Sequence, residues 1–513
     1  MNARPLPLAA CAALALAALP APAESPDKAS PSTTATTSPR DPLGGDTLLE
    51  TVRILAGTDF GGRLAGSAGY DAAASWAADR FRALGLEPFG GDAYFQQFPI
   101  ELNEIDTCEL ALVPAGGLAP EFHLGPDYVC RGFTGSGTFT APLTFVGWGL
   151  SLPGKYDDYR DVDVHGRVVV AFKDAPSWTV DKDGWGDAGK PRPKSIAAAA
   201  HGALGLILVT PPSEKQRNPI GSVLHGPGAQ PVSFPQFHVA PRVAEELLRG
   251  SALKLEDVQK AIEEKKAPQS FELPGLVKMN VHARYRPDAP GRNVVGVLRG
   301  SHAKRGDEYL VIGAHLDHVG TQGRSDGAHV MFPGANDNAS GSATLLGLAE
   351  AFAALPERPR RSVIFVLFAG EEQGIDGSRW FADHPPVPLD KVVAMLNVDC
   401  VGHGAGQVEL GGGKSAPKLY KLALAFDKKN GAHLTGDSWH GGGADAEPFF
   451  LKGLPTLYAH AKDSYEFLHL PGDTAETINP ALLENAARLV FGVAREVADG
   501  GYKREKLAPK PKS

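Results

Sequence analysis

A series of His, Asp and Glu side chains follows in order along the C-terminal part of the chain. They stand in the segments GAHLDHVG, GANDNASG, FAGEEQG, NVDCVG and EFLHLPGDT, and they are His315, Asp317, Asp337, Glu371, Glu372, Asp399 and His469. Imidazole and carboxylate groups are zinc ligands, and such a series can hold a pair of ions. One carboxylate would bridge the ions, each ion would take one His and one further carboxylate, and a spare Glu would move protons.

Each of these residues also has an ordinary structural explanation. A lone His-x-Asp pair, such as His315 with Asp317, more often surrounds a structural His, whose ring the Asp orients. Asp337 lies in a turn before a helix and on its own would be a helix cap. Glu371 and Glu372 are harder to explain, because two adjacent carboxylates at the end of a buried strand are costly without a positive charge between them. A metal ion supplies that charge, with one Glu as ligand and the other as base.

From about residue 285 the chain alternates between strand-like and helix-like segments. Apolar runs such as YLVIGA, SVIFVLF and VVAMLNVD are typical of buried strands, and PALLENAARLVFGVAREVA is typical of a helix. This alternation predicts an α/β fold with a mostly parallel central sheet and helices on both faces. In such sheets functional residues gather at the carboxyl ends of strands. We therefore expect convergence of the residues that directly follow strands: His315, Glu371, Glu372 and Asp399.

The 513-residue chain has a formal net charge of -8, with 43% hydrophobic and 21% charged residues. These values are typical of a soluble globular protein with an ample core. The mildly acidic balance argues against nucleic-acid binding as a main role. The N-terminal apolar stretch is too short and too Ala-rich for a membrane-spanning helix, and no other segment reaches spanning length.

The first residues have the composition of a secretory leader. A basic start at Arg4, an Ala-rich apolar stretch and the A-x-A pattern ending at Ala23 predict a signal peptide over residues 1–23 and a periplasmic or secreted location. Cys11, in the sequence LAAC, offers an alternative lipoprotein cleavage site, which is disfavoured because most of the apolar stretch follows it. Residues 24–46 are rich in Ser, Thr and Pro and predict a linker.

The middle of the chain differs from its flanks in composition and in its expected secondary structure. Short strands with many Gly and Pro residues, such as APLTFVGWG and GRVVVAF, predict a β-rich domain at residues 105–284. A catalytic domain would then comprise residues 47–104 and 285–500, with a basic tail at 501–513. Because the middle segment contains none of the candidate ligands, we expect it to shape access or substrate choice.

Three cysteines follow the expected cleavage site. Cys108 and Cys130 are close enough in sequence to form one disulfide in an oxidising compartment, and two separate buried thiols fit equally well. Cys400 lies at a strand end in MLNVDCVG and is expected to be a small buried side chain beside the metal site.

In order and spacing, these motifs resemble the co-catalytic zinc aminopeptidase family, which also contains glutamate carboxypeptidases and glutaminyl cyclases. The motifs that carry the resemblance are His315-x-Asp317, Asp337-Asn338, Glu371-Glu372, Asn397-x-Asp399 and His469-x-Pro471-x-Asp473-Thr474. The resemblance spans about residues 47–104 and 285–500. The segment 105–284 resembles the protease-associated domain that is often inserted in such enzymes.

The resemblance implies two zinc ions and a role for each residue of the series. One ion would be held by His315 and Asp399, the other by Glu372 and His469, with Asp337 bridging both. Glu371 would be the general base that takes a proton from the attacking water and passes it to the leaving amine. Asp317 would support the site by orienting the ring of His315.

The substrate pocket departs from the family pattern. Family members often carry Ser-Asp-His before a GIP segment, whereas this chain has Ala444-Asp445-Ala446. Asp445 is retained and is a candidate substrate-binding residue. Tyr465 is a second candidate, which could help to hold an oxyanion or could simply be a packed aromatic. Further histidines near the motifs, His318 among them, are expected to be loop or supporting residues rather than ligands.

These features predict a dizinc exopeptidase, and an aminopeptidase acting on peptides fits them best, because clustered carboxylates suit a free ammonium group. A carboxypeptidase or dipeptidase would share the metal residues but needs Arg or Lys for the substrate carboxylate. No Arg occurs between Arg379 and Arg488. A glutaminyl cyclase and a non-enzymatic binding protein are further alternatives. Relatives of glutaminyl cyclases usually lack the inserted domain. A non-enzymatic binding protein would be expected to have lost metal ligands.

Overall fold

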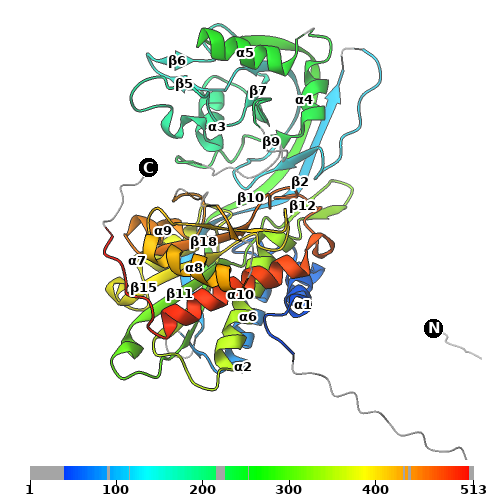
Figure 1. Ribbon diagram of the computed structural model, residues 1–513. Coiled ribbons are helices and arrows are strands. Elements are labelled where there is room, and N and C mark those ends of the chain that lie inside the picture. The colour runs from blue at the N-terminus through cyan, green and yellow to red at the C-terminus, as the bar shows by residue number, and fades with distance from the viewer. Residues whose placement is uncertain are drawn as a thin grey trace, which may run out of the picture. The chain divides into compact units, whose positions relative to one another are not determined.

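The computed structural model describes residues 40–507, apart from 89–92, 115, 215–225, 252, 431–433, 437–438 and 440 (Figure 1). The expected signal peptide, Cys11, most of the expected linker and the last residues of the expected tail lie outside the described residues. None of the helices in the described part of the chain is both long enough and apolar enough to span a bilayer.

The candidate ligands belong to a region built on parallel strands. In the order in which they pair, these strands are β18 (Thr456–Ala461), β15 (Val392–Val398), β11 (Tyr309–His315) and β14 (Ser362–Phe368). Antiparallel strands flank them, β16 (Val408–Gly411) beside β18 and β10 (Ser270–Leu298) beside β14. Every residue of β11, β14 and β15 is buried, because helices cover both faces of the sheet. The sequences of these strands are therefore continuous apolar runs. The expected α/β fold with a mostly parallel sheet is confirmed.

Alternate strand residues face two different helical layers. Leu310 and Ile312 belong to the larger core, which is covered by α1 (Gly45–Leu55), α2 (Ala68–Ala83), α6 (Gly341–Ala353), α8 (Pro417–Asn430) and α10 (Pro480–Ala498). Val311 faces the opposite side, which is covered by α7 (Asp376–Asp383) and α9 (Glu447–Leu451). This alternation follows from the two-residue period of a strand.

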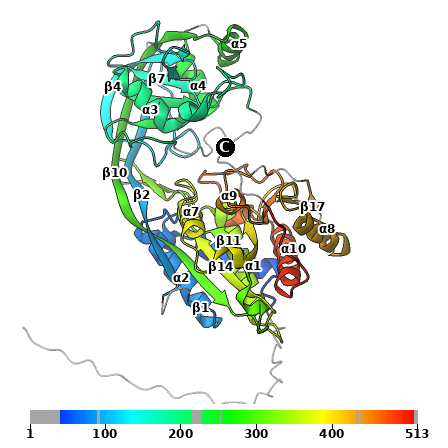
Figure 2. The same cartoon turned by 90° about the vertical axis from the view of Figure 1, so that its left-hand side faces the viewer.

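Two long strands connect this region with a second one (Figure 2). They are β2 (Phe95–Val113) and β10, which pair antiparallel. The second region comprises β3 (Tyr128–Cys130), β4 (Gly137–Val146), β7 (Val168–Phe172), β8 (Gly205–Val209), β9 (Gln236–Val239), α3 (Pro191–Ala200), α4 (Pro241–Leu248) and α5 (Leu255–Lys265). It has an apolar core of its own, which includes Phe145, Phe172 and Phe237. Its likeness to a protease-associated domain stays a prediction.

Both long strands run across the expected limits of the middle segment at residues 105 and 284. The two regions therefore share continuous hydrogen-bonded backbone rather than a flexible connection. The remaining strands are short: β1 (Glu87–Pro88), β5 (Ser151–Leu152), β6 (Tyr156–Asp157), β12 (Thr321–Gly323), β13 (His329–Met331) and β17 (Leu434–Thr435).

The ends of the described chain are more ordered than their composition indicated. Helix α1 begins at Gly45, inside the expected linker of residues 24–46. At the other end, Arg361 donates a hydrogen bond to the carbonyl of Tyr502, and Arg504 donates two to carbonyls beside β15. These bonds hold the first residues of the expected basic tail, 501–513, against the sheet.

The cysteines behave as buried side chains. The Sγ atoms of the thiols Cys108 and Cys130 lie 2.7 Å apart, because β2 and β3 bring these two side chains into contact. Cys400 is also a buried thiol and follows Asp399 directly.

Candidate active site

The residues expected at strand ends do converge. His315 is the last residue of β11, the Glu371–Glu372 pair follows β14, and Asp399 follows β15. Because these three strands are adjacent and parallel, their carboxyl ends lie at one edge of the sheet. Asp337 reaches the same edge from the helical turn Ala335–Ser340.

Asp337 lies between two imidazole rings. Its Oδ1 atom is 3.2 Å from Nε2 of His315, and its Oδ2 atom is 2.8 Å from Nε2 of His469. Nε2 of His315 also lies 3.3 Å from Oδ1 of Asp399. Nε2 of His469 lies 2.8 Å from Oε2 of Glu372. Each carboxylate oxygen of Asp337 thus faces a separate pair of one His and one acid.

The donor atoms form compact groups of metal-binding type. One group comprises His315, Asp337 and Asp399, a second comprises His318, Asp337, Glu372 and His469, and a third comprises His315, Glu371 and Glu372. Within each group the donor atoms lie within 4.8 Å of one another. Nitrogen and oxygen donors at this density are the ligand set that zinc prefers.

The buried carboxylates of these groups raise the pKa of the neighbouring imidazoles. Although burial disfavours the charged ring, Glu372 and Asp337 raise the pKa of His469 to about 9. Against the same effect of burial, Asp399 and Asp337 raise the pKa of His315 well above its usual value. A metal cation at these positions supplies the same positive charge without the protons, so the residues fit zinc.

Residues 293–494, which include every residue of these groups, match the family model described as Peptidase family M28. We call residues 293–494 the M28 region, after the family model that they match. A probable leucine aminopeptidase of Trichophyton verrucosum is 29% identical over 205 residues, which cover 38% of this chain and 55% of the relative. The chain therefore spans about half the length of the curated relatives it matches.

Two solved structures share the fold over most of the chain. A Peptidase M28 precursor from Shewanella amazonensis SB2B aligns with a TM-score of 0.63 at 19% identity, covering 91% of this chain and 96% of the other. BSAP, a zinc aminopeptidase from Bacillus subtilis, aligns with a TM-score of 0.60 at 19% identity, covering 91% and 99%. The family resemblance expected from the motifs is confirmed.

Hydrogen bonds fix the turn that carries Asp337 in the M28 region. Asp473, from the motif after His469, accepts the backbone N–H groups of Asn336 and Asp337 at 2.8 and 3.0 Å. Asn336 Oδ1 accepts two backbone N–H groups of the loop after Asp399, and the peptide bond between Asp337 and Asn338 is cis. The loops that follow three separate strands are thereby joined around Asp337.

Asp317 supports the Glu pair as well as the His. Nδ1 of His315 lies 3.2 Å from the backbone carbonyl oxygen of Asp317 and 3.7 Å from its carboxylate Oδ1. Its two carboxylate oxygens also accept the backbone N–H groups of Glu371 and Glu372, both at 3.3 Å. Burial raises the pKa of Asp317 to about 7. Besides lying beside the ring that it was expected to orient, Asp317 therefore holds the backbone of the Glu371–Glu372 pair.

His318 lies inside the M28 site, where sequence analysis expected a loop or supporting residue. Its Nδ1 atom is 2.7 Å from Oε1 of Glu372 and 3.8 Å from Oδ2 of Asp337. The ring is completely buried and packs edge-on against His469 at 5.3 Å. In the sequence, His318 is the second His of the HLDH motif, three residues after His315. A motif of this kind does not by itself distinguish a site residue from a loop residue.

We expect His318→Ala to weaken metal binding at Glu372 and His469 by about 10- to 100-fold, because the change removes the group that orients the Glu372 carboxylate. Competition with a chelator measures this affinity. His329→Ala, an exposed His on β13, is the matched control. An unchanged affinity in His318→Ala would show that Glu372 is oriented without it.

Arg63 is completely buried beneath the candidate metal ligands, and its sequence pattern did not indicate a site residue. Its guanidinium donates hydrogen bonds of 2.6–2.8 Å to the backbone carbonyls of Leu55, Leu316, Pro333 and Gly334. Burial lowers the pKa of Arg63 to about 10, and the charges of Asp473 and Asp337 oppose this effect. Arg63 therefore holds the loops together and places a positive charge behind the carboxylates.

The two candidate substrate-binding residues occupy different surroundings. Asp445 is 0% exposed, and burial raises its pKa to about 7, so it faces the protein interior rather than a cavity wall. Tyr465 is partly exposed in the loop before His469, and burial of its hydroxyl raises its pKa. Of the two, only Tyr465 is partly exposed.

Proposed function

We propose that this protein is a zinc-dependent exopeptidase that removes N-terminal residues from peptides with two zinc ions. The observation that carries the proposal is the Asp337 carboxylate, with one oxygen 3.2 Å from His315 and the other 2.8 Å from His469. A shared carboxylate between two His–acid pairs is the arrangement that a two-metal hydrolase needs. The name of the T. verrucosum relative, a probable leucine aminopeptidase, supports the same activity.

The proposed ligands divide into two sets around a shared residue. His315 and Asp399 would hold one ion, Glu372 and His469 the other, and Asp337 both. Zinc, when bound, polarises the scissile carbonyl and lowers the pKa of water. Among the remaining residues, His318 orients Glu372 and Asp317 holds the Glu371–Glu372 backbone in place.

Glu371 is the proposed general base. It is partly exposed, follows β14 and lies in one donor group with His315 and Glu372. Burial, together with the charge of Glu372, raises the pKa of Glu371 well above its usual value. A carboxylate with a raised pKa accepts a proton from water more readily and can then deliver it to the leaving amine.

Metal analysis tests the two-zinc part of the proposal. The purified protein should contain close to two zinc equivalents, and a chelator should abolish peptide cleavage. Asp337→Ala should lose both ions, since it faces both sets of ligands. A fully active enzyme that holds a single ion would contradict the bridging role of Asp337.

Substrate chemistry tests the exopeptidase direction. A long peptide with a free amine should be cleaved from its N-terminus, and N-acetylation should abolish cleavage because the ammonium is lost. Amidation of the distant C-terminus should matter little. Cleavage that requires a free C-terminus and tolerates N-acetylation would favour a carboxypeptidase, and ring closure of an N-terminal Gln without hydrolysis would favour a glutaminyl cyclase.

A further inference from the structure

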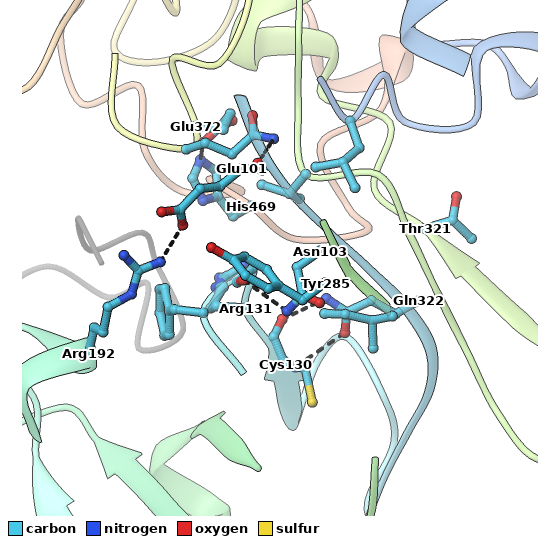
Figure 3. Close-up of a pocket in the computed structure, with 16 residues that line it drawn as sticks. Glu101, Asn103, Cys130, Arg131, Arg192, Tyr285, Thr321, Gln322, Glu372 and His469 are labelled. Carbon is cyan, nitrogen blue, oxygen red and sulfur yellow. Dashed lines mark hydrogen bonds and ion pairs between the residues drawn. The ribbon is translucent and has the colours of Figure 1, made fainter. Parts of the chain in front are cut away.

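One of the two proposed ligand sets lines the cavity shown in Figure 3. Glu372 and His469 form part of its wall, and Arg131 of the middle region lines it as well. Asp399 and His315, of the other set, are not among the described residues of this wall, and both are buried. The position of Asp399 therefore depends on the protein groups that contact it.

Strand β18 holds both the backbone and the side chain of Asp399. The backbone N–H of Asp399 donates a hydrogen bond to the carbonyl of Ala459 at 3.0 Å. The neighbouring residue on β18, Tyr458, donates its hydroxyl to Oδ2 of Asp399 at 3.2 Å. The other carboxylate oxygen, Oδ1, lies 3.3 Å from Nε2 of His315. One oxygen of Asp399 is thus held by the protein, and the other faces the proposed partner ligand.

The ring of Tyr458 has little freedom to move. It is 5% exposed, and its backbone pairs with Asn397 of β15 on one side and with Gly411 of β16 on the other. The ring of His460 stacks on it at 5.0 Å, and Trp439 packs against it at 5.9 Å. A buried Tyr hydroxyl needs a hydrogen-bond partner, and the carboxylate of Asp399 supplies it.

The alanines at 444 and 446 belong to the same contact. They stand where similar proteins often carry Ser and His, and both are buried in one apolar cluster with Tyr458 and Trp439. Because an alanine side chain ends at Cβ, neither residue can donate a side-chain hydrogen bond to Asp399. The contact of this cluster with Asp399 is the hydroxyl of Tyr458.

We propose that Tyr458 is a positioning residue of the candidate metal site, whose hydroxyl holds Asp399 so that Oδ1 faces the ion that Asp399 would share with His315. This inference rests on the proposed two-zinc function. A ligating carboxylate that is hydrogen-bonded by a neighbouring group is already oriented before the metal binds. Tyr458 is not itself a ligand, so its whole effect on the ion passes through Asp399.

The substitution Tyr458→Phe tests this role, because it removes the hydroxyl and keeps the ring in its packing. The affinity for one of the two zinc ions should fall by about 10- to 100-fold, and the affinity for the other should stay unchanged. Stepwise competition with a chelator measures both affinities without reference to turnover. Tyr309→Phe is the matched control, because Tyr309 is 6% exposed, lies at the far end of β11 from His315 and accepts a hydrogen bond from Arg299.

Asp399→Ala shows through which residue Tyr458 acts. This variant should retain only the ion of Glu372 and His469. Adding Tyr458→Phe should leave the affinity for that ion unchanged, because the described contacts of Tyr458 include neither of its ligands. A further loss of affinity in the double variant would mean that Tyr458 acts on the other ligand set, which contradicts the inference.

The remaining outcomes separate this inference from the proposed function. Wild-type affinities for both ions in Tyr458→Phe would overturn the role of Tyr458 and leave the two-zinc proposal intact. An equal loss at both ions would show that Tyr458 supports the fold as a whole, and would also overturn it. A wild-type protein that binds fewer than two zinc ions would contradict the proposed function and this inference together. Two bound ions without peptide cleavage would contradict the aminopeptidase activity alone.

Discussion

Glu371→Gln should lower turnover by roughly 10²–10⁴-fold while zinc content stays unchanged. The substitution preserves the shape of the side chain but removes its capacity to accept a proton. Glu371 belongs to the donor group of His315 and Glu372, and burial raises its pKa well above the usual value, so it is suited to take a proton from the attacking water. The hydrogen bonds from the backbone to Asp317 do not involve the substituted group and should persist.

Steady-state kinetics on a free-amine substrate, together with metal analysis, measures this effect. Glu357→Gln, which changes an exposed Glu in the same region, is the matched control and should behave as wild type. Glu372→Gln should differ from both by losing zinc. If Glu371→Gln retains near-normal turnover with full zinc content, a different group moves the proton.

Arg63→Met should lower the free energy of unfolding by about 3–5 kcal/mol. The change leaves four backbone carbonyls without their buried donors, and it removes the positive charge that lies behind Asp473 and Asp337. Unsatisfied buried acceptors carry the full cost of desolvation. Because Leu316 and Pro333 belong to the segments that carry the ligands, zinc affinity should fall as well.

Chemical denaturation of the zinc-free protein measures the stability effect separately from metal binding. Arg82→Met, on the exposed side of α2 in an ion pair with Asp79, is the control and should cost less than about 1 kcal/mol. The loss of unfolding free energy in Arg63→Lys should lie between those of Arg63→Met and Arg82→Met, because Lys keeps the charge but cannot reach all four carbonyls. A loss below about 1 kcal/mol in Arg63→Met would mean that water replaces the guanidinium.

Local sequence patterns were sufficient for the sheet and for much of the site. The apolar runs before His315, Glu371 and Asp399 predicted buried strands, and the rule that parallel strands end at one edge predicted that these residues converge. The structure places them there, with Asp337 and His469 added from loops. The convergence was predictable because a buried parallel strand can be recognised from a short apolar run of sequence. His315, Glu371 and Asp399 each lie at the end of such a run or within a few residues of it.

Other features depended on contacts between segments far apart in the chain. Arg63 stands in a Gly-rich turn and Arg131 after a short strand of the middle region, and neither has a local pattern that separates it from a surface arginine. Only the fold buries Arg63 under the carbonyls of Leu316 and Gly334, and only the hydrogen bonds of Cys130 with Gln322 place Arg131 at the cavity that Glu372 also lines. The sequence by itself determined the strands and the order of the candidate ligands. The tertiary structure decided which buried cations surround them, because burial and charge balance are properties of the assembled fold.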